Sequence, residues 1–383
     1  MLRTSLDSLP ASRIREAANA ALGREDIVKF WFGEGDLPTP DFIRAAAKAA
    51  LDAGETFYNH NLGIAELRQA IADYASKLHG VRIEAARIAV TSAGVNALSL
   101  IAQALLDPGD RVAIVTPVWP KLTSIPRIMG AEVVRVPLDC RAGTWSPDLQ
   151  KLVDAAAPGT RAVIVNSPNN PTGWTMPQAD WNALLAHCRK HGIWLVSDDA
   201  YERLVYTGEP HAPGVLAQID DGERFISANT FSKSWTMTGW RLGWLIAPSR
   251  FVADFGKLVE FNTSCAPPFV QRAGIVAIRD GEPLIRGTVA RLRRARDLLV
   301  QRLRALPGVE AAAPPGAMYL FFRIPGRSDD SLAFAKELVT RSGLGLAPGV
   351  AFGAEGEGYL RWCFAATEAL IEQGVERLAR HLH

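Results

Sequence analysis

The chain has 383 residues but little cysteine, and its few thiols are far apart. The four cysteines are Cys140, Cys188, Cys265 and Cys363. They form no CxxC pair and show no regular spacing, so the sequence favours free thiols in a reducing compartment over a disulfide framework. We therefore expect a cytoplasmic protein.

Long apolar runs and an excess of one charge are also missing. No run approaches the roughly 20 apolar residues of a membrane helix, and the start of the chain contains no apolar core of signal-peptide length. The formal net charge is only +2, which gives no reason to expect a nucleic-acid or membrane partner. With 48% hydrophobic and 21% charged residues, the composition is typical of a globular protein with a large core.

Several catalytic motifs are missing as well. No G-x-G-x-x-G follows an expected strand and no G-x-x-x-x-G-K-[ST] is present, which argues against hydride transfer and against a P-loop. His187 and His191 are four residues apart, but "HCRKH" has no glutamate after the first histidine, so we expect a helix surface and no metal. Only about 30 residues precede "GEGDLPTP", too few for the helix-turn-helix domain of a regulator.

What the sequence does contain, from about residue 87 onward, is an alternation of buried-strand patterns with amphipathic helices. This alternation predicts an α/β fold in which a mostly parallel sheet of about seven strands is sandwiched between helices. The expected strands are 87–91, 111–117, 131–138, 161–166, 193–197, 224–230 and 241–247.

The two ends of the chain depart from this pattern and indicate a second, smaller lobe. A long arginine-rich helix is expected from about residue 283, and fewer strands and helices follow it. We predict a large α/β domain at 46–285 and a small α+β domain at 286–383. The N-terminal segment 1–45 is expected to pack with the small domain.

Ligands of such sheets bind beyond the carboxyl ends of the strands, and small or aromatic residues follow the first two strands here. Ala93, Gly94 and Val95 come after the strand 87–91. At a helix start their backbone N–H groups could hold a phosphate, although a plain strand-to-helix turn explains them too. Trp119 follows the next strand, where it either packs in the core or stacks on a flat ligand.

Amide and carboxylate side chains follow the next two strands. Asn170 lies in "SPNNPTG", where it is either a turn residue or a ligand contact. Asp198, Asp199 and Tyr201 follow the strand 193–197. A carboxylate at the end of a buried strand is costly unless it meets a cation or donors. We expect one aspartate to point inward and the other to cap a turn or face solvent.

Lysine is scarce, with nine in the chain, yet Lys233 lies in the polar stretch "NTFSKSWTMTGWRLGW". A solvated surface lysine is the ordinary interpretation of such a residue. At a strand end, however, a desolvated lysine becomes a nucleophile for carbonyls. Hydroxyl, guanidinium and turn residues that could surround a dianionic phosphate lie in the same stretch; these are Thr230, Ser232, Gly239, Arg241 and Gly243.

Together these groups fit pyridoxal phosphate, which needs a Schiff-base lysine and a partner at its pyridinium nitrogen. In this interpretation Lys233 forms the Schiff base and Asp198 pairs with the ring nitrogen. Trp119 stacks on the ring, while Asn170 and Tyr201 form hydrogen bonds to its hydroxyl oxygen. The phosphate would be held by Ala93, Gly94, Val95, Thr230, Ser232 and Arg241.

The sequence resembles the fold-type-I pyridoxal phosphate enzymes of the aspartate and aromatic aminotransferase superfamily, class I/II. The resemblance rests on "SPNNPTG", "SDDAY" and "TFSKSWTMTGWRLGW". Three further stretches agree and follow the family's order: "GEGDLPTP", "YNHNLGIAELRQAIA" and "YLRWCFA". The cradle Ala93-Gly94-Val95 departs from the family in lacking a side-chain hydroxyl or cation.

The resemblance implies roles for individual residues. Lys233 would move the substrate α-proton, with Asp198 and Tyr201 as its catalytic partners. Arg361 would clamp the substrate α-carboxylate beside Gly33, and Trp119 and Asn170 would also contact the substrate. In a homodimer with active sites at the interface, one further residue would reach the cofactor phosphate of the neighbouring subunit, namely Tyr58.

The activity implied is transfer of an amino group between an L-amino acid and a 2-oxo acid by a ping-pong mechanism. A carbon–sulfur β-lyase is the alternative, because it needs the same lysine and ring contacts. We identify no arginine for a substrate side-chain carboxylate, which leans against strict aspartate specificity. Candidate pocket residues from both subunits are Trp31, Phe32, His60, Asn61, Lys121, Ser264, Cys265 and Tyr319.

Overall fold

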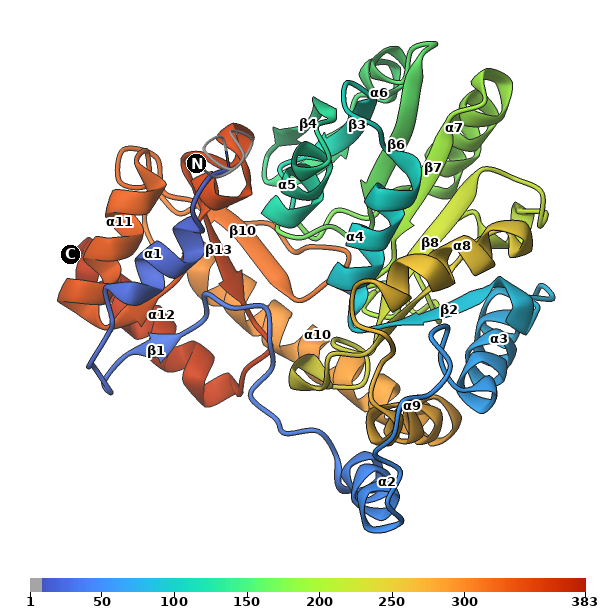
Figure 1. The fold of residues 1–383 in the computed structure, drawn as a ribbon. Coiled ribbons are helices and arrows are strands. Elements are labelled where there is room, and N and C mark those ends of the chain that lie inside the picture. Colours follow the sequence, from blue (N-terminus) through green and yellow to red (C-terminus); the bar gives the residue numbers. More distant parts are fainter. Residues whose placement is uncertain (1–8) are drawn as a thin grey trace, which may run out of the picture.

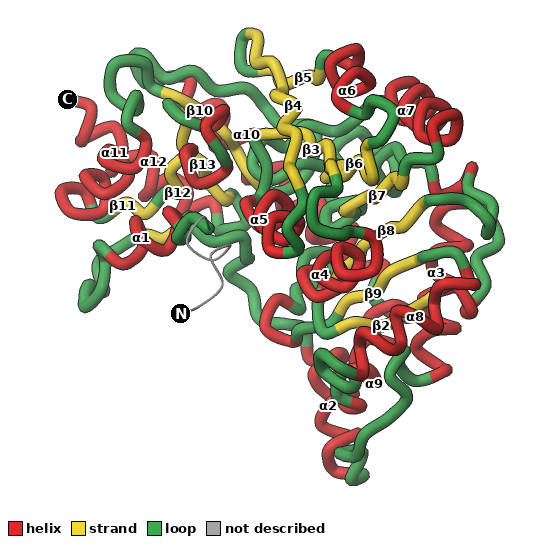
Figure 2. Tube along the Cα trace, turned by 45° about the horizontal axis from the view of Figure 1, so that its top comes forward, coloured by secondary structure: helices red, strands yellow, loops and turns green. Residues whose placement is uncertain are grey.

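An eight-stranded sheet forms the centre of the larger lobe in the computed structural model, which describes residues 9–383 (Figures 1 and 2). Residues 1–8 of the predicted N-terminal segment lie outside the described residues. In spatial order the strands are β2 (Ile88–Thr91), β9 (Gly243–Ile246), β8 (Phe225–Thr230), β7 (Trp194–Asp198), β6 (Thr160–Asn166), β3 (Arg111–Thr116), β4 (Glu132–Arg141) and β5 (Thr144–Pro147).

The sheet is mostly parallel, which confirms the predicted α/β class. Strands β8, β7, β6, β3 and β4 pair in parallel, and β2 runs in the same direction because it is antiparallel to β9, which is antiparallel to β8. The eighth strand, β5, pairs antiparallel with β4. The sequence predicted seven strands and missed β5, because a four-residue strand that ends in proline gives little periodic signal.

Helices cover both faces of this sheet, since its strands present apolar side chains to each side. On β3, Val112 and Ile114 belong to one core cluster, and Ala113 and Val115 to the other. The first cluster includes α4 (Gly94–Leu105), α5 (Pro120–Ile128) and α8 (Ser249–Glu260). The second includes α2 (Asp41–Asp52), α3 (Ala65–His79), α6 (Leu149–Ala155), α7 (Gln178–His191) and α9 (Pro268–Asp280).

The smaller lobe is built around a three-stranded antiparallel sheet. Its strands lie in the order β10 (Tyr319–Arg323), β13 (Tyr359–Cys363) and β12 (Ala347–Pro348). The helices that share its apolar core are α10 (Glu282–Arg304), α11 (Ser331–Glu337) and α12 (Glu368–Leu382). This lobe holds Arg361 in the middle strand, β13.

The N-terminal elements divide between the two lobes (Figure 1). Helix α1 (Arg13–Asn19) contacts α11 and β12 of the smaller lobe, and β1 (Val28–Lys29) pairs in parallel with β11 (Leu344–Gly345). Helix α2, in contrast, packs against α9 of the larger lobe. The domain boundaries at 45/46 and 285/286 stay predictions; α10 runs unbroken across the second of them.

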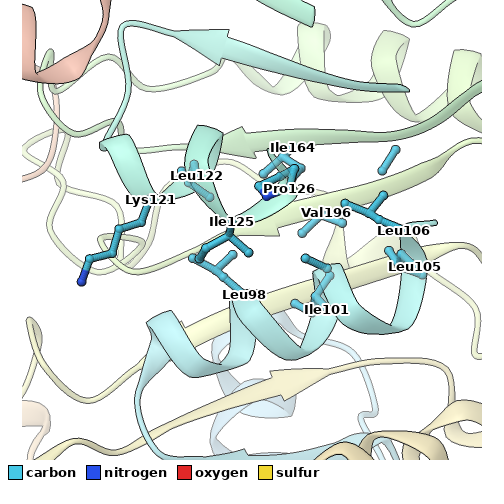
Figure 3. A pocket seen from close by; sticks show the side chains of 12 residues that line it. Leu98, Ile101, Leu105, Leu106, Lys121, Leu122, Ile125, Pro126, Ile164 and Val196 are labelled. Carbon is cyan, nitrogen blue, oxygen red and sulfur yellow. The ribbon is translucent and has the colours of Figure 1, made fainter. Parts of the chain in front are cut away.

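A small apolar cavity of about 20 Å³ lies between α4, α5 and the sheet. Leu98 and Ile101 of α4 face Leu122 and Ile125 of α5 across it (Figure 3). Among the helices of residues 9–383, none combines the length and the apolar character needed to cross a membrane.

Candidate active site

A cavity of about 290 Å³ opens at the carboxyl ends of the parallel strands and reaches the smaller lobe. Twelve of the fourteen predicted site residues line it: Gly33, Gly94, Val95, Trp119, Asn170, Asp198, Tyr201, Thr230, Ser232, Lys233, Arg241 and Arg361. The lining residues that the sequence did not single out are Ile14, Leu98, Asn166, Ala200 and Asn229. Asn166 and Asn229 are strand residues, so the strand-end argument could have found them.

Lys233 brings an amine into the cavity just after the end of β8. Its Nζ donates a hydrogen bond to the carbonyl oxygen of Gly33. Burial lowers the pKa of Lys233 to about 8, because the charged ammonium loses its hydration. The amine is therefore neutral in a substantial fraction of molecules near neutral pH, which a nucleophile or a proton acceptor requires.

Asp198 places a carboxylate at the end of β7, next to β8. Its Oδ1 accepts a hydrogen bond from the backbone N–H of Ala200 at 3.2 Å, and within the described part of the chain it forms no ion pair. Burial raises the pKa of Asp198 to about 7. A buried carboxylate that faces a cavity and is left unpaired by the described residues suits a ligand that brings a protonated nitrogen.

An anion cradle lies where α4 begins. Ala93 has a φ of 107° and turns the chain into the helix at Gly94, so that free N–H groups of the first turn face the cavity. A Cβ on Gly94 would lie 3.0 Å from the Cβ of Thr230 and 3.2 Å from the carbonyl oxygen of Asn229. Glycine therefore favours this close approach of the helix start to the end of β8, because a side chain would force its neighbours to shift.

Two hydroxyls and a guanidinium complete the cradle. Thr230 Oγ1 donates to Ser232 Oγ at 2.9 Å and accepts from the backbone N–H of Ser232 at 3.1 Å. Arg241, at a φ of 55°, donates from Nη1 to the carbonyl oxygen of Thr238 at 2.6 Å. These groups and the helix start are the donor set that a phosphate requires.

Arg361 supplies a second cation from the smaller lobe. Its Nη1 donates to Asn170 Oδ1 at 2.9 Å and its Nη2 to the carbonyl oxygen of Trp31. The guanidinium carbon lies 4.4 Å from the centre of the Tyr319 ring. Its Nε is buried, and no acceptor in the described residues meets it. The guanidinium is thus rigidly placed and has no carboxylate partner, so it can take one from a ligand.

Tyr201 and Tyr319 join the two lobes at the cavity floor. Their hydroxyl oxygens lie 2.7 Å apart, and burial raises the pKa of Tyr201 well above its ordinary value. Tyr319 also contacts Gly33 closely, because a Cβ on Gly33 would lie 2.1 Å from the Tyr319 hydroxyl oxygen. Tyr319 was only a candidate pocket residue in the sequence, yet it holds both Gly33 and Arg361 in place.

Several predicted residues lie outside the cavity of the single chain. Ala93 is buried just before the cradle, and Tyr58 is 89% exposed. Among the candidate pocket residues, Trp31, Phe32, Lys121 and Tyr319 line the cavity, whereas His60, Asn61, Ser264 and Cys265 do not.

The two histidines considered for a metal lie on α7, away from the cavity lining. The ring centres of His187 and His191 are 4.6 Å apart, and His187 Nε2 lies 2.7 Å from the carbonyl oxygen of Ala156. The part of the chain from residue 9 onward contains no cluster of three side chains that could hold a metal ion.

The fold and this donor set define a pyridoxal phosphate-dependent enzyme. The chain matches the family model for aminotransferase class I and II over residues 27–378 and belongs to that family. Members of this family use pyridoxal phosphate to transfer amino groups, so the predicted cofactor and the predicted aminotransferase activity are confirmed.

Similar proteins cover nearly the whole chain. An aspartate aminotransferase of Pyrococcus horikoshii is 34% identical over 373 residues, which span 97% of this chain and 94% of that protein. An arginine–pyruvate transaminase of Pseudomonas aeruginosa is 32% identical over 93% of this chain and 90% of its own length. The structure of a Thermus thermophilus aspartate aminotransferase with maleate aligns with a TM-score of 0.92 at 32% identity, covering 99% of both chains. These similar proteins are aminotransferases, and none of them supports the lyase alternative.

Proposed function

We propose that the residues around this cavity bind pyridoxal phosphate and exchange an amino group between an L-amino acid and a 2-oxo acid. The observation that carries the assignment is the arrangement at two neighbouring strand ends. The Lys233 amine is made easier to deprotonate by burial, and the Asp198 carboxylate faces the same cavity without an ion-pair partner in residues 9–383. The cradle of Gly94, Thr230 and Arg241 lies beside them and fits the phosphate.

When bound, pyridoxal phosphate supplies the electron sink for the electron pair of the broken Cα–H bond. Asp198 would keep the ring nitrogen protonated, because a positive charge there would stabilise the buried carboxylate. Asn170 and Tyr201 would hold the ring oxygen, and the flat side chain of Trp119 could stack on the ring.

Arg361 orients the substrate. Its guanidinium is fixed by Asn170 and the backbone of Trp31, so a bidentate contact with the α-carboxylate fixes the direction of the Cα–H bond. The neutral Nζ of Lys233 then takes the α-proton and returns a proton in the second half-reaction, as a general base and acid. Tyr319 keeps this geometry by packing against both Gly33 and Arg361.

We also propose that the enzyme is a homodimer with shared active sites. Phe57, Tyr58 and Phe261 are 81%, 89% and 91% exposed in the single chain, and exposed aromatic side chains are typical of interfaces. The segment after Phe261 adjoins the cradle helix, since Asn96 Nδ2 donates to Asn262 Oδ1 at 2.8 Å. A partner covering this surface would therefore lie close to the phosphate cradle. The four free cysteines fit the reducing cytoplasm that we propose as its location.

A screen of half-reactions tests the assignment. The loaded enzyme is mixed with single amino acids, and absorbance spectra report conversion of the pyridoxal to the pyridoxamine form. We expect conversion by at least one amino acid and its reversal by a 2-oxo acid. L-Cystathionine is included in the panel, and release of pyruvate and a thiol without amino transfer would instead indicate a carbon–sulfur lyase.

A further inference from the structure

Lys121 is a cation of the cavity that the proposed roles leave without a function. It is the second residue of α5 and follows Trp119 closely in the chain. Its Nζ lies 4.9 Å from the centre of the Trp119 ring. Figure 3 shows its side chain extended away from the apolar side chains of Leu98 and Ile125, so the ammonium lies outside that apolar cavity. Lys121 also lines the larger cavity.

The other cations of the cavity have partners that Lys121 lacks. Lys233 donates to Gly33, Arg241 to Thr238, and Arg361 to Asn170. Across residues 9–383 no carboxylate and no hydrogen-bond acceptor pairs with Lys121. The contact that the described residues offer the ammonium is the aromatic face of Trp119.

The electrostatic surroundings of Lys121 favour an anion. Burial lowers the pKa of Lys121, and the nearby positive charges of Arg241 and Arg15 lower this pKa further. An anionic ligand would raise the pKa of Lys121 again, because it stabilises the charged ammonium. The apolar side chains of Val95 and Leu98 line the cavity from α4 and offer no competing carboxylate.

The charges expected in the cavity when cofactor and substrate are bound also leave Lys121 free to meet an anion. Arg241 and the start of α4 meet the cofactor phosphate, Arg361 meets the substrate α-carboxylate, and Asp198 meets the ring nitrogen. The ammonium of Lys121 comes from a different helix, beside the aromatic side chain expected to cover the ring. None of these contacts uses the ammonium of Lys121, so it can meet a further anionic group, which a dicarboxylic substrate would supply.

We propose that Lys121 binds a carboxylate at the far end of the substrate side chain and thereby selects dicarboxylic amino acids and their 2-oxo acids. This assignment rests on the proposed function. The search for an arginine with this role found none in the sequence, and a lysine that reaches in from α5 supplies the missing charge. A lysine binds a carboxylate as a point charge, so it tolerates side chains of different length.

The experiment compares amino acids that differ in charge but hardly in size. Half-reaction kcat and KM are measured for glutamate against glutamine and for aspartate against asparagine. The proteins are the loaded wild type, Lys121→Ala, Lys121→Arg and a control, Lys257→Ala. Lys257 is an exposed lysine of α8 whose Nζ lies 2.7 Å from Asp254, so its loss removes the same charge away from the cavity. The affinity for pyridoxal phosphate is titrated for every variant.

In Lys121→Ala we expect the ratio of kcat/KM for glutamate to that for glutamine to fall about tenfold, because a partly solvated charge contact is lost. The aspartate/asparagine ratio should fall likewise. The change should lie mainly in KM, since the contact exists in both the ground state and the transition state. Lys121→Arg should retain most of the ratio, and Lys257→Ala should match the wild type.

Four results would overturn the assignment. Equal losses for charged and neutral amino acids, with weaker binding of pyridoxal phosphate, would place Lys121 at the cofactor phosphate. Unchanged ratios would make it a surface charge. A wild-type enzyme that converts neutral amino acids but discriminates against glutamate and aspartate would exclude the proposed specificity. The proposed aminotransferase function would still hold. A wild type that converts no amino acid would contradict the proposed function itself, and this assignment with it.

Discussion

Asp198 and Asp199 are neighbours in the chain, yet their carboxylates lie in different surroundings. Asp198 lines the cavity, and within residues 9–383 its carboxylate accepts a hydrogen bond only from the backbone of Ala200. Asp199 points away from the cavity lining and accepts hydrogen bonds from the hydroxyls of Ser197 and Ser227. We expected the second aspartate to cap a turn or face solvent; its residue is partly exposed, and two seryl hydroxyls bind its carboxylate. Asp198 alone is left to meet a cation in the cavity.

This difference predicts unequal effects of removing the two charges. Asp198→Asn should lower the rate of the half-reaction by at least about 100-fold, because the buried charge that supports the ring nitrogen is lost. Asp199→Asn keeps hydrogen-bonding capacity toward Ser197 and Ser227 and should lose far less. Single-turnover absorbance measurements with saturating amino acid give both rates. A greater loss in Asp199→Asn would reverse the roles of the two residues.

The raised pKa of Asp198 also predicts a pH-dependent effect on stability in the cofactor-free protein. Burial raises this pKa from 3.8 to about 7, so the folded protein favours the protonated carboxyl. Ionisation of Asp198 lowers the free energy of unfolding progressively as pH rises from about 4 to about 7, and the full loss of stability persists above that range. Cofactor-free Asp198→Asn should therefore be more stable than the wild type at pH 8, by on the order of a few kcal/mol. Urea unfolding at pH 8 and pH 4 measures the difference, which should vanish at the lower pH.

Lys233 should control the uptake of the cofactor and its pH dependence. Because burial lowers the pKa of Lys233 to about 8, the fraction of neutral amine rises with pH, reaches one half near that value and levels off roughly two pH units above it. The rate of covalent capture of pyridoxal phosphate by the cofactor-free enzyme should follow this curve. Absorbance kinetics between pH 6 and pH 10 measure it, and peptide mapping after borohydride reduction locates the attachment. A midpoint near that of an ordinary lysine, or a pyridoxyl group on another lysine, would contradict the assignment.

Gly243 should be intolerant of a side chain, whereas Gly239 should accept one. A Cβ on Gly243 would lie 2.6 Å from the carbonyl oxygen of Asn229, 2.6 Å from the nitrogen of Gly94 and 2.7 Å from the carbonyl carbon of Ala93. All three are backbone atoms of the cradle, so Gly243→Ala should cost about 1–3 kcal/mol of stability and weaken cofactor binding. The Cβ of Gly239→Ala would meet no atom within 4 Å. The sequence suggested that both glycines let the backbone turn tightly around the phosphate, and the structure leaves room for a side chain at Gly239. Thermal unfolding and cofactor titration of the two variants test this contrast.

Hybrid dimers test whether Tyr58 serves the site of a neighbouring subunit. Tyr58→Ala and Lys233→Ala are each expected to be impaired as homodimers. Co-refolding or co-expression should give hybrids in which one site carries both defects and the other carries neither. Activity should then return to about half of the wild-type value per hybrid dimer, because one of its two active sites is intact. No recovery in hybrids purified with two different affinity tags would show that Tyr58 acts within its own subunit or not at all.

The local sequence predicted which residues lie at the strand ends and form the site, for a physical reason. Runs such as "RAVIVN" and "IWLVS" are apolar on both sides and β-branched, so they become buried parallel strands. Residues that directly follow them, including Asp198 and Lys233, must then meet at one edge of the sheet. Arg361 could not be found in this way. It lies within a strand of the other lobe, and only the family resemblance suggested it.

Tertiary structure alone decided the contacts between segments that are remote in the sequence. The Tyr319 hydroxyl lies beside Gly33 and Tyr201, and Gly243 lies against the backbone of Gly94, because the two lobes and the strands of the sheet pack there. The direction in which Lys121 extends likewise depends on how α5 packs against α4 (Figure 3). Periodicity and turn residues determine which segments form strands and helices. Which side chains share a cavity depends on how segments remote in the sequence pack together, so the sequence could name Lys121 only as a candidate pocket residue, and the fold decided that it lines the cavity.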